Sequence, residues 1–336
     1  MSYFKNKCCL ITGGGGSLGS ALVPRLLDEG AGVVRVLDNN EHALFKLEEK
    51  FGWDRVRYLI GSVRDRDRLK HAMDDVDIVF HAAAYKIIPY GEYSPTELVK
   101  TNIIGSKNVA EVAMECDVDK VVGISSDKAC SPLNLYGSTK LCMERIFVSL
   151  NFYKGKHRTK FFNTRYGNVL GSQDSVVPIW KEQLAKSKPL TLTKGEMTRF
   201  QITLQEGVNF IFRSIQTARG GEVFVPKLKA YYVKDLLDVF IEVAGSNPAV
   251  EEIPVRPGEK PHELLINENE MRTAVTFGSF QDYAILPDES TIKRFGLRFY
   301  FDEPVKFPEP TAYSSETVEK LTVNELKEIL LKEGLV

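Results

Sequence analysis

The sequence predicts an α/β protein that has a doubly wound parallel sheet and a smaller C-terminal α/β lobe. The first observation is a series of short apolar runs, such as residues 8–11 and 121–124, typical of strands buried on both faces. The second is helical spacing of apolar residues after such runs, for example Leu18, Leu22 and Leu26. This alternation continues to about residue 168, and repeated βα units of this kind form parallel sheets with helices on both faces.

The individual elements can be placed in order along the chain. Strands are predicted over residues 8–11, 33–37, 56–60, 78–80, 121–124 and 161–166. Helices are predicted from Leu18 to before Gly30, over 41–49, from Pro95 to before Asp117, and over the segment that carries Tyr136. In the second half, Thr203-Leu-Gln-Glu206 and Thr322-Val-Asn-Glu325 are capping-box patterns that begin helices, the first ending near Ala218. Residues 222–225 are predicted to add one more strand to the main sheet.

A chain of 336 residues is too long for one ordinary core, so two domains are expected. We predict a first domain over residues 1–168, to which residues 203–235 return. Residues 169–202 and 236–336 are predicted to form the smaller lobe.

Composition excludes several classes of function. Lys and Arg number 44 against 45 Asp and Glu, so nothing indicates a nucleic-acid partner. No apolar run approaches the ~20 residues that cross a bilayer, and the N-terminus lacks the shape of a signal peptide. The five cysteines include no Cys-x-x-Cys pair, which favours reduced thiols in a cytoplasmic protein. We assign no residue to a metal site.

A glycine-rich turn follows the first strand, with the spacing Gly13-x-x-Gly16-x-x-Gly19. A strand before it and an amphipathic helix after it are the context that a dinucleotide fingerprint requires. Gly13 permits a tight turn, Gly16 admits the pyrophosphate and Gly19 lets the helix pack closely. The diphosphate would lie on the helix N-terminus beside Ser17 and Leu18, where amides and the helix dipole favour negative charge. The alternative is a glycine-rich turn that binds nothing.

Asp38 ends the second strand, where a carboxylate accepts hydrogen bonds from the ribose hydroxyls of NAD and repels a 2′-phosphate. Asn39 follows it instead of an arginine, so NAD is favoured over NADP. The alternative for Asp38 is an N-cap of the helix over residues 41–49.

Tyr136 and Lys140 are four residues apart and share one face of a helix. A phenolate can take the proton of an alcohol while its hydride leaves, and an ammonium stabilises that phenolate. Ser126, at the end of the preceding strand, can hydrogen-bond the same oxygen. Asp127 and Lys128 add an acid and an amine beside this group. The alternatives are a surface Tyr–Lys pair and an exposed ion pair.

The glycine pattern, Asp38, the Tyr136–Lys140 pair and the chain length resemble the extended short-chain dehydrogenase/reductase family, a Rossmann-type family that acts on nucleotide sugars. The segment from Ser126 to Ala129, followed by Pro132 to Gly137, is similar to the inverting UDP-N-acetylglucosamine 4,6-dehydratases that begin pseudaminic acid synthesis. Further matches are His81-Ala-Ala-Ala-Tyr-Lys86, Lys100-Thr-Asn102, Arg165-Tyr-Gly-Asn168-Val, Met197-Thr-Arg199-Phe200, Val225-Pro-Lys227 and Arg256-Pro-Gly-Glu259-Lys260. The resemblance covers nearly the whole chain and is weakest beyond residue 270.

The resemblance implies a recycled, tightly bound NAD and a dehydration that inverts C5, giving UDP-2-acetamido-2,6-dideoxy-β-L-arabino-hex-4-ulose. Tyr136 would take the C4 hydroxyl proton, Lys128 would remove the C5 proton and Asp127 would protonate the departing C6 hydroxyl. A plain epimerase needs no such acid and base, so the Asp127–Lys128 pair is the discriminating feature. Further implied cofactor contacts are Ser62, Val63 and Ala82. Implied substrate contacts are Lys86, Ser126, Asn168, Val176, Arg199, Arg256 and Glu259, among which arginine and lysine suit a diphosphate.

The sequence also departs from the family pattern. Ser62 stands where relatives often carry an aspartate for the adenine amino group, and Ser126 stands where many have threonine. Some relatives carry an arginine-type NADP signature after the second strand, which Asp38-Asn39 lacks.

Three other functions stay open at this point. They are a dehydratase that retains C5, a UDP-sugar 4-epimerase, and a redox-sensing binding protein without catalysis, against which the intact Tyr136 and Lys140 count. The sequence does not fix the sugar. A homo-oligomer, a dimer or a hexamer, is expected by analogy with relatives.

Overall fold

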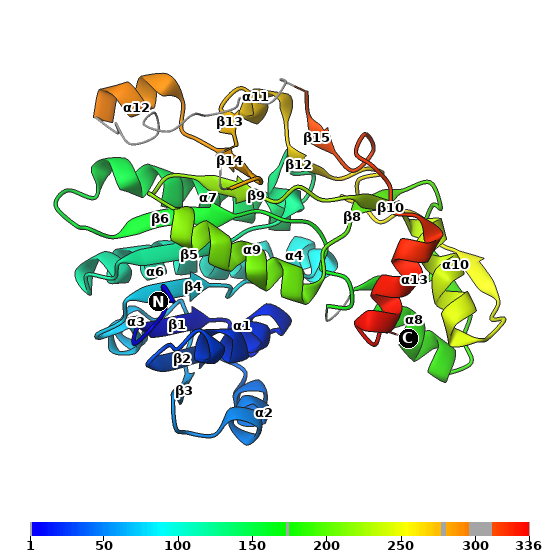
Figure 1. Ribbon diagram of the computed structural model, residues 1–336, viewed down its shortest axis with the longest axis horizontal. Coiled ribbons are helices and arrows are strands. Elements are labelled where there is room, and N and C mark those ends of the chain that lie inside the picture. Colours follow the sequence, from blue (N-terminus) through cyan, green and yellow to red (C-terminus); the bar gives the residue numbers. More distant parts are fainter. Residues whose placement is uncertain (1, 173–174, 277–279, 296–310, 336) are drawn as a thin grey trace.

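The computed structural model describes residues 2–172, 175–276, 280–295 and 311–335. A nine-stranded sheet forms the larger part of the molecule, and a smaller lobe lies beside it (Figure 1). The strand order is β13-β14-β9-β6-β5-β4-β1-β2-β3. The strands are β1 (Cys8–Thr12), β2 (Val33–Asp38), β3 (Val56–Ile60), β4 (Ile78–His81), β5 (Lys120–Ile124), β6 (Lys160–Thr164), β9 (Val223–Val225), β13 (Ala274–Val275) and β14 (Tyr283–Ile285).

The seven strands from β3 to β9 run parallel, which confirms the predicted doubly wound sheet. The predicted strands all form, with ends within two residues of the predicted ones. The order reverses beside β1, which pairs with both β2 and β4. Ligands of open α/β sheets bind at the carboxyl ends of the strands near such a reversal.

Helices cover both faces of the sheet and bury two apolar clusters. Leu22 and Leu26 of α1 (Ser17–Asp28) pack with Ile211 of α9 (Leu204–Thr217) against one face. Val109 of α6 (Gly105–Glu115) and Phe147 of α7 (Leu135–Tyr153) belong to the cluster on the other face. The remaining helices of this part are α2 (Glu41–Phe51), α3 (Arg66–Met73), α4 (Ile88–Tyr93), α5 (Pro95–Leu98), α11 (Glu268–Met271) and α12 (Glu289–Phe295).

The helix predicted from Pro95 to before Asp117 forms, but its hydrogen-bond register changes in the middle. The π-helix η1 (Val99–Ile104) joins α5 to α6. Within it, the side-chain amide of Asn102 donates to the carbonyl oxygen of Tyr85 (2.9 Å) and to the Thr139 hydroxyl (3.0 Å). These bonds fasten the helix to the loop after β4 and to α7.

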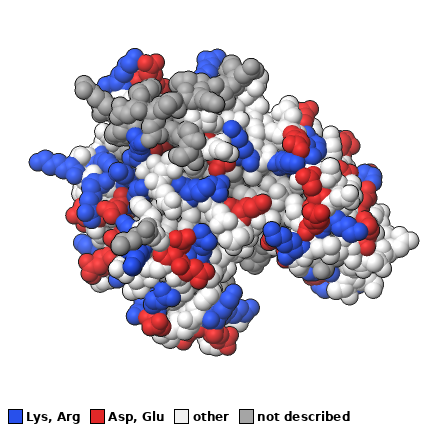
Figure 2. Space-filling model, in the orientation of Figure 1, with Lys and Arg blue, Asp and Glu red and all other residues white. Residues whose placement is uncertain are grey.

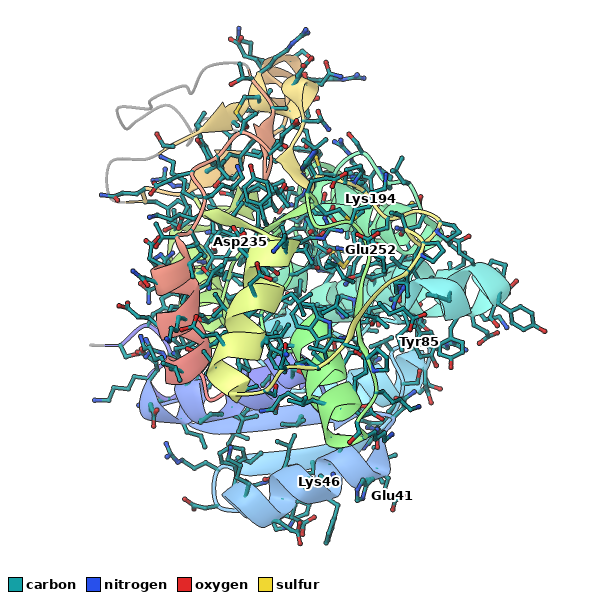
Figure 3. All side chains as sticks on the ribbon, turned by 90° about the vertical axis from the view of Figure 1, so that its right-hand side faces the viewer. Glu41, Lys46, Tyr85, Lys194, Asp235 and Glu252 are labelled. Atoms are coloured by element: carbon teal, nitrogen blue, oxygen red, sulfur yellow. The ribbon has the colours of Figure 1, made fainter. Side chains whose placement is uncertain are left out.

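The lobe has its own apolar core, in which Trp180 and Phe240 pack ring against ring. Seen from the lobe side, Lys194, Asp235 and Glu252 lie far from α2, which carries Glu41 and Lys46 (Figure 3). The elements of the lobe and its junction with the sheet are α8 (Val176–Ala185), β7 (Leu190–Leu192), β8 (Thr198–Phe200), β10 (Ala230–Tyr232), α10 (Val233–Ala244), β11 (Val250–Glu252), β12 (Leu264–Ile266), β15 (Tyr313–Ser314) and α13 (Val323–Lys332).

One part of the chain lies elsewhere than predicted. Residues 236–336 were assigned to the lobe, but β14 pairs antiparallel with β9 and β13 pairs with β14, so both extend the main sheet. Their buried residues, Ala274 and Ile285, complete an apolar cluster with Val223 and Val225 of β9. This edge of β9 would otherwise expose backbone groups and apolar side chains.

Both capping boxes are confirmed: Thr203 and Glu206 cap α9 reciprocally, as Thr322 and Glu325 cap α13. Across the described ranges, no helix is both long and apolar enough to pass through a bilayer. Lys and Arg are interspersed with Asp and Glu over the face in Figure 2.

A buried ion cluster ties the C-terminal part of the chain to the sheet. Arg165 is 1% exposed and donates to both oxygens of Glu144 (2.9 and 2.6 Å) and of Glu270 (2.8 and 2.8 Å). Burial opposes the charge of Glu270, but its hydrogen bonds from Arg165 outweigh this and lower its pKa. Losing the guanidinium would leave two carboxylates buried together without a cation.

We therefore expect Arg165→Met to lower the free energy of unfolding by about 3–5 kcal/mol. Urea denaturation followed by circular dichroism measures this change. The control is Asp238→Asn, which removes an exposed i,i+4 pair with Lys234 and should change the free energy by less than about 0.5 kcal/mol. Equal effects of the two variants would contradict the structural role of the cluster.

Candidate active site

A cleft of about 990 Å³ opens at the carboxyl ends of the strands and extends to the lobe. Every sequence-predicted site residue except Asp127 lines it, so the structure brings the whole predicted set together. Asp127 is 1% exposed and lies beneath the lining, next to Lys128. The lining residues are Gly13, Gly16, Ser17, Leu18, Gly19, Asp38, Asn39, Ser62, Val63, Ala82, Lys86, Ser126, Lys128, Tyr136, Lys140, Asn168, Val176, Arg199, Arg256 and Glu259.

The glycine-rich turn has the shape that a dinucleotide needs. Gly13 has φ +70°, and a Cβ there would lie 2.6 Å from the backbone of Ala83. A Cβ on Gly19 would lie 2.4 Å from the Cα atom of Gly14, so the helix packs on the turn without side chains between them. Gly16 is the N-cap of α1 and provides no side-chain cap, so the first N–H groups of the helix are suited to an anion.

Asp38 holds a fixed position at the end of β2. Its Oδ2 atom accepts a hydrogen bond from the Gly15 amide (2.8 Å), and its Oδ1 atom accepts one from the Asn40 amide (2.9 Å). The N-cap of α2 is Asn40, whose side chain accepts from the Ala43 amide, so the alternative assignment of Asp38 as that cap is wrong. The carboxylate is thus available beside the turn for a ribose.

Tyr136 and Lys140 lie near the start of α7, below the end of β5. The Lys140 amine donates to the carbonyl oxygen of Ile124 (2.7 Å), and its burial lowers its pKa to about 8. Removal from water raises the pKa of Tyr136, although the charge of Lys128 and hydrogen bonding to Ser126 act in the opposite direction. A cation beside the phenol is the requirement for proton removal by a tyrosine.

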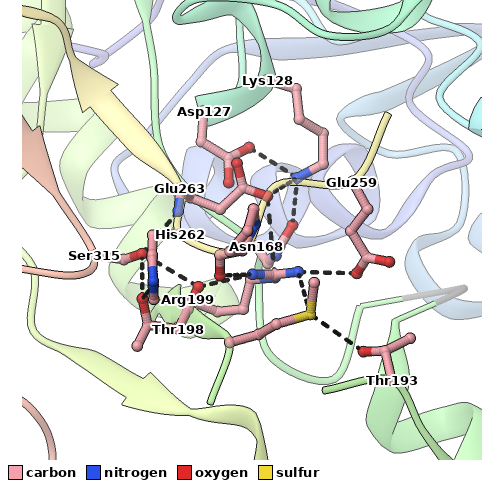
Figure 4. Close-up of polar contacts among 12 residues, drawn as sticks. Asp127, Lys128, Asn168, Thr193, Thr198, Arg199, Glu259, His262, Glu263 and Ser315 are labelled. Carbon is pink, nitrogen blue, oxygen red and sulfur yellow. Dashed lines mark hydrogen bonds and ion pairs between the residues drawn. The ribbon is translucent and has the colours of Figure 1, made fainter. Parts of the chain in front are cut away.

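Lys128 belongs to the short 3₁₀ turn η2 (Asp127–Ala129) after β5. Its amine donates to Asp127 Oδ1 (3.1 Å), Asn168 Oδ1 (3.1 Å) and Glu263 Oε1 (3.4 Å), three acceptors from three separate segments (Figure 4). An ammonium has three donors, so all three are used. Burial opposes its charge, but the carboxylates of Asp127 and Glu263 outweigh burial and raise the pKa of Lys128.

Arg199 on β8 lies at the lobe side of this group. Its guanidinium makes four hydrogen bonds, to the carbonyl oxygens of Thr198 and Pro261, to Met197 Sδ and to Glu259 Oε1 (Figure 4). Arg199 and Glu259, both predicted to contact substrate, therefore pair with each other at 2.9 Å.

Glu263 is the residue of this site that the sequence did not predict. It lies one position before β12, and its side chain is 4% exposed. It is four residues beyond Glu259, in the segment that carries the Arg256–Lys260 motif, but no periodic pattern or spacing links it to Lys128. Only the fold brings these two residues, 135 positions apart, into contact.

A family model described as polysaccharide biosynthesis protein matches residues 9–284. The chain belongs to this family. The description of the family names no single reaction.

Three relatives illustrate this range. An inverting UDP-N-acetylglucosamine 4,6-dehydratase of Campylobacter jejuni is 38% identical over 318 residues, 93% of each chain. A UDP-glucose 4-epimerase of Rickettsia canadensis is 33% identical over 336 residues, 98% of this chain and 96% of the relative. An uncharacterized membrane protein of Methanocaldococcus jannaschii is 47% identical over 277 residues, 80% of this chain and 83% of the relative.

Two solved structures agree with the fold. Pen from Bacillus thuringiensis has a TM-score of 0.91 and 36% identity, covering 99% of this chain and all of that one. A Thermus thermophilus UDP-glucose 4-epimerase in complex with NAD has a TM-score of 0.65 and 23% identity, covering 75% of this chain and 88% of that one. The resemblance to inverting 4,6-dehydratases that the sequence motifs predicted is confirmed by the relative from Campylobacter.

The position of Lys140 predicts an unusual titration. In the protein without ligands, its amine should titrate near pH 8, because burial disfavours the charged form, whereas the exposed Lys234 beside Asp238 should titrate above the ordinary lysine value. An NMR titration of ¹³C-labelled lysine side chains measures both. Lys140→Arg assigns the signal, and titration of Lys140 at the ordinary lysine value would contradict its burial.

Proposed function

We propose that this chain is an NAD-dependent UDP-N-acetylglucosamine 4,6-dehydratase that inverts C5. The observation that carries the proposal is the Asp127–Lys128 pair: Lys128 lines the same cleft as Tyr136 and Lys140, and the buried carboxylate of Asp127 lies directly beneath it. Oxidation of an alcohol needs the Tyr136–Lys140 couple, and removal of a proton beside the new ketone needs the Asp127–Lys128 pair, so the two pairs must lie together. The name of the Campylobacter relative, which is similar over nearly the whole chain, supports the same reaction.

The residues of the cleft fit a dinucleotide. The N-terminus of α1 would hold the diphosphate, Asp38 the adenosine ribose, and Tyr136 and Lys140 the nicotinamide ribose. Ser62, Val63 and Ala82 would line the rest of the dinucleotide site. NAD, when bound, accepts a hydride from C4 of the sugar and returns it to C6. The carboxylate of Asp38 would repel a 2′-phosphate, so NAD is favoured over NADP.

The protein's own groups would divide the proton transfers. Tyr136 takes the proton of the C4 hydroxyl, stabilised by Lys140, while Ser126 orients that oxygen. The ketone at C4 acidifies the C5 proton, which Lys128 removes. Asp127 protonates the departing C6 oxygen, which leaves as water. A proton returned to C5 from the opposite face completes the inversion.

The lobe side of the cleft would hold UDP. Arg199, Arg256 and Lys86 are the cations that suit the diphosphate, and Glu259 is an acceptor suited to the uridine ribose. Asn168, which already contacts Lys128, would touch the sugar, and Val176 would pack on the uracil.

Epimerisation at C4 is the second candidate, because the Rickettsia relatives bear that name. An epimerase returns the hydride to C4 and needs no acid and base at C5 and C6. The buried Asp127–Lys128 pair therefore favours the dehydratase over the epimerase.

The product in deuterated water distinguishes these reactions. We expect the chain, incubated with UDP-N-acetylglucosamine and NAD, to give a C6 methyl signal in proton NMR. C5 should carry deuterium, because its proton is replaced from solvent. A parallel reaction in ordinary water keeps H5, and the absence of a nuclear Overhauser effect between H3 and H5 should show the inverted centre. A C6 methyl product that shows this effect would indicate a retaining dehydratase, and formation of the galacto isomer alone would show an epimerase.

Lys128→Met should remove the base without removing the oxidation couple. We expect kcat for the 4-keto-6-deoxy product to fall on the order of 10²–10⁴-fold. The KM for UDP-N-acetylglucosamine should change much less. The matched control is Lys107→Met on α6, whose side chain is 54% exposed and pairs with Glu111; it should leave kcat unchanged. Normal turnover by Lys128→Met would show that another group is the base.

A homo-oligomer and a role in pseudaminic acid synthesis stay predictions from the resemblance, and a cytoplasmic location stays a prediction from the cysteine content. Size-exclusion chromatography with light scattering tests the dimer and the hexamer directly.

A further inference from the structure

The hydrogen bonds of Lys128 raise a difficulty for its proposed role. A base needs a lone pair, but each of the three N–H groups of the ammonium already has an acceptor (Figure 4). Its raised pKa, caused by the two carboxylates against the effect of burial, keeps it charged at neutral pH. One of the three acceptors must therefore take a proton before Lys128 can act.

The three acceptors differ in their ability to do so. The amide oxygen of Asn168 does not become protonated near neutral pH. Asp127 must itself carry a proton in order to protonate the C6 oxygen. Glu263 is the one acceptor that can receive a proton from Lys128 while Asp127 keeps its own.

The surroundings of Glu263 favour this exchange. Burial raises the pKa of Glu263, against the effect of Lys128. Among the described residues, neither Glu263 Oε2 nor Asp127 Oδ2 has a hydrogen-bond partner, although both atoms are buried. A buried carboxylate oxygen without a donor is poorly stabilised as an anion and accepts a proton readily.

The position of Glu263 is fixed by its backbone. Its amide donates to Ser315 Oγ (2.8 Å), and the Ser315 amide donates back to the carbonyl oxygen of Glu263 (2.9 Å). The neighbouring His262 forms a bridge with Thr198 on β8. Within the described ranges, the other charged or titratable groups that act on Lys128 or Glu263 are Asp127, Arg199 on β8, Tyr136 on α7, Tyr231 on β10 and Lys260.

We propose that Glu263 is a positioning residue that takes a proton from Lys128 and so makes its amine a base; this rests on the proposed dehydratase function. One N–H bond of Lys128 breaks, its electron pair stays on nitrogen, and an O–H bond forms on Glu263. The neutral amine then takes the C5 proton, the C5–C6 double bond forms, and the C6 oxygen leaves as water with the proton of Asp127. The cluster exchanges protons internally, so the step requires no proton loss to solvent.

Glu263→Gln keeps the shape and removes the proton acceptor. Lys128 must then lose its proton to water, so kcat at pH 7 should fall on the order of 10²-fold. The ratio of variant to wild-type kcat should then rise about tenfold per pH unit until Lys128 is deprotonated. This ratio cancels the titration of Tyr136, which both proteins share. Loss of the carboxylate also lowers the pKa of Lys128, which brings the rise to lower pH.

Two variants separate proton transfer from a structural effect. Glu263→Asp retains a carboxylate. The ratio of its kcat to the wild-type kcat should therefore not change with pH, even if its kcat is lower. Glu259→Gln changes an acid in the same segment that pairs with Arg199; it should raise KM for UDP-N-acetylglucosamine and give a flat ratio. Thermal unfolding of each variant verifies that it is folded.

The outcomes are distinct. The proposal is supported if the ratio of the Glu263→Gln kcat to the wild-type kcat rises with pH. It is overturned if this ratio is one, or if kcat falls by the same factor at every pH. If the wild-type chain forms no C6 methyl product, the proposed function fails and this inference fails with it. If the wild type forms the product and Glu263→Gln matches it, only the inference fails.

Discussion

The ammonium of Lys128 is the charge on which the arrangement of the site depends. A cation that is largely withdrawn from water is stable only where acceptors surround it. Its three acceptors, Asp127, Asn168 and Glu263, come from η2 after β5, from the segment after β6 and from the position just before β12. The sheet, the lobe junction and the C-terminal strands must therefore meet at one point, and the active cleft forms around it.

Polar contacts beside the site hold the C-terminal segment against the rest of the chain. Lys260 donates to the carbonyl oxygen of Cys130 (2.6 Å), and the Asn134 side chain donates to the carbonyl oxygen of Gly258 (3.0 Å). The Arg165 cluster binds the next part of the chain through Glu270. These bonds surround η2 and the start of α7, so the reacting side chains have little freedom to separate.

Local signals predicted most of the fold. Apolar runs identified the strands of the sheet up to β9, and the Thr203 and Thr322 capping boxes identified two helix starts, because these patterns are set by neighbours in sequence. The glycine turn, Asp38, Tyr136 and Lys140 belong to segments that follow strand ends and were found for the same reason, whereas Ser62, Val63, Ala82 and Lys86 came from the family resemblance. The role of Glu263 and the pairing of β14 with β9 were not predicted, because both depend on contacts between segments far apart in the chain. The π turn at Asn102 likewise leaves no pattern in the local sequence.

The separation between Lys128 and Glu263 has a consequence for how the protein is made. A ribosome that has released the first half of the chain has already supplied the glycine turn, Asp38, Tyr136 and Lys140. At that stage Lys128 lacks one of its carboxylate partners, and β9, which follows in the sheet, has not been synthesised. On the roles proposed for these residues, competence for elimination would arise late in translation, well after the chain has supplied the groups proposed for cofactor binding.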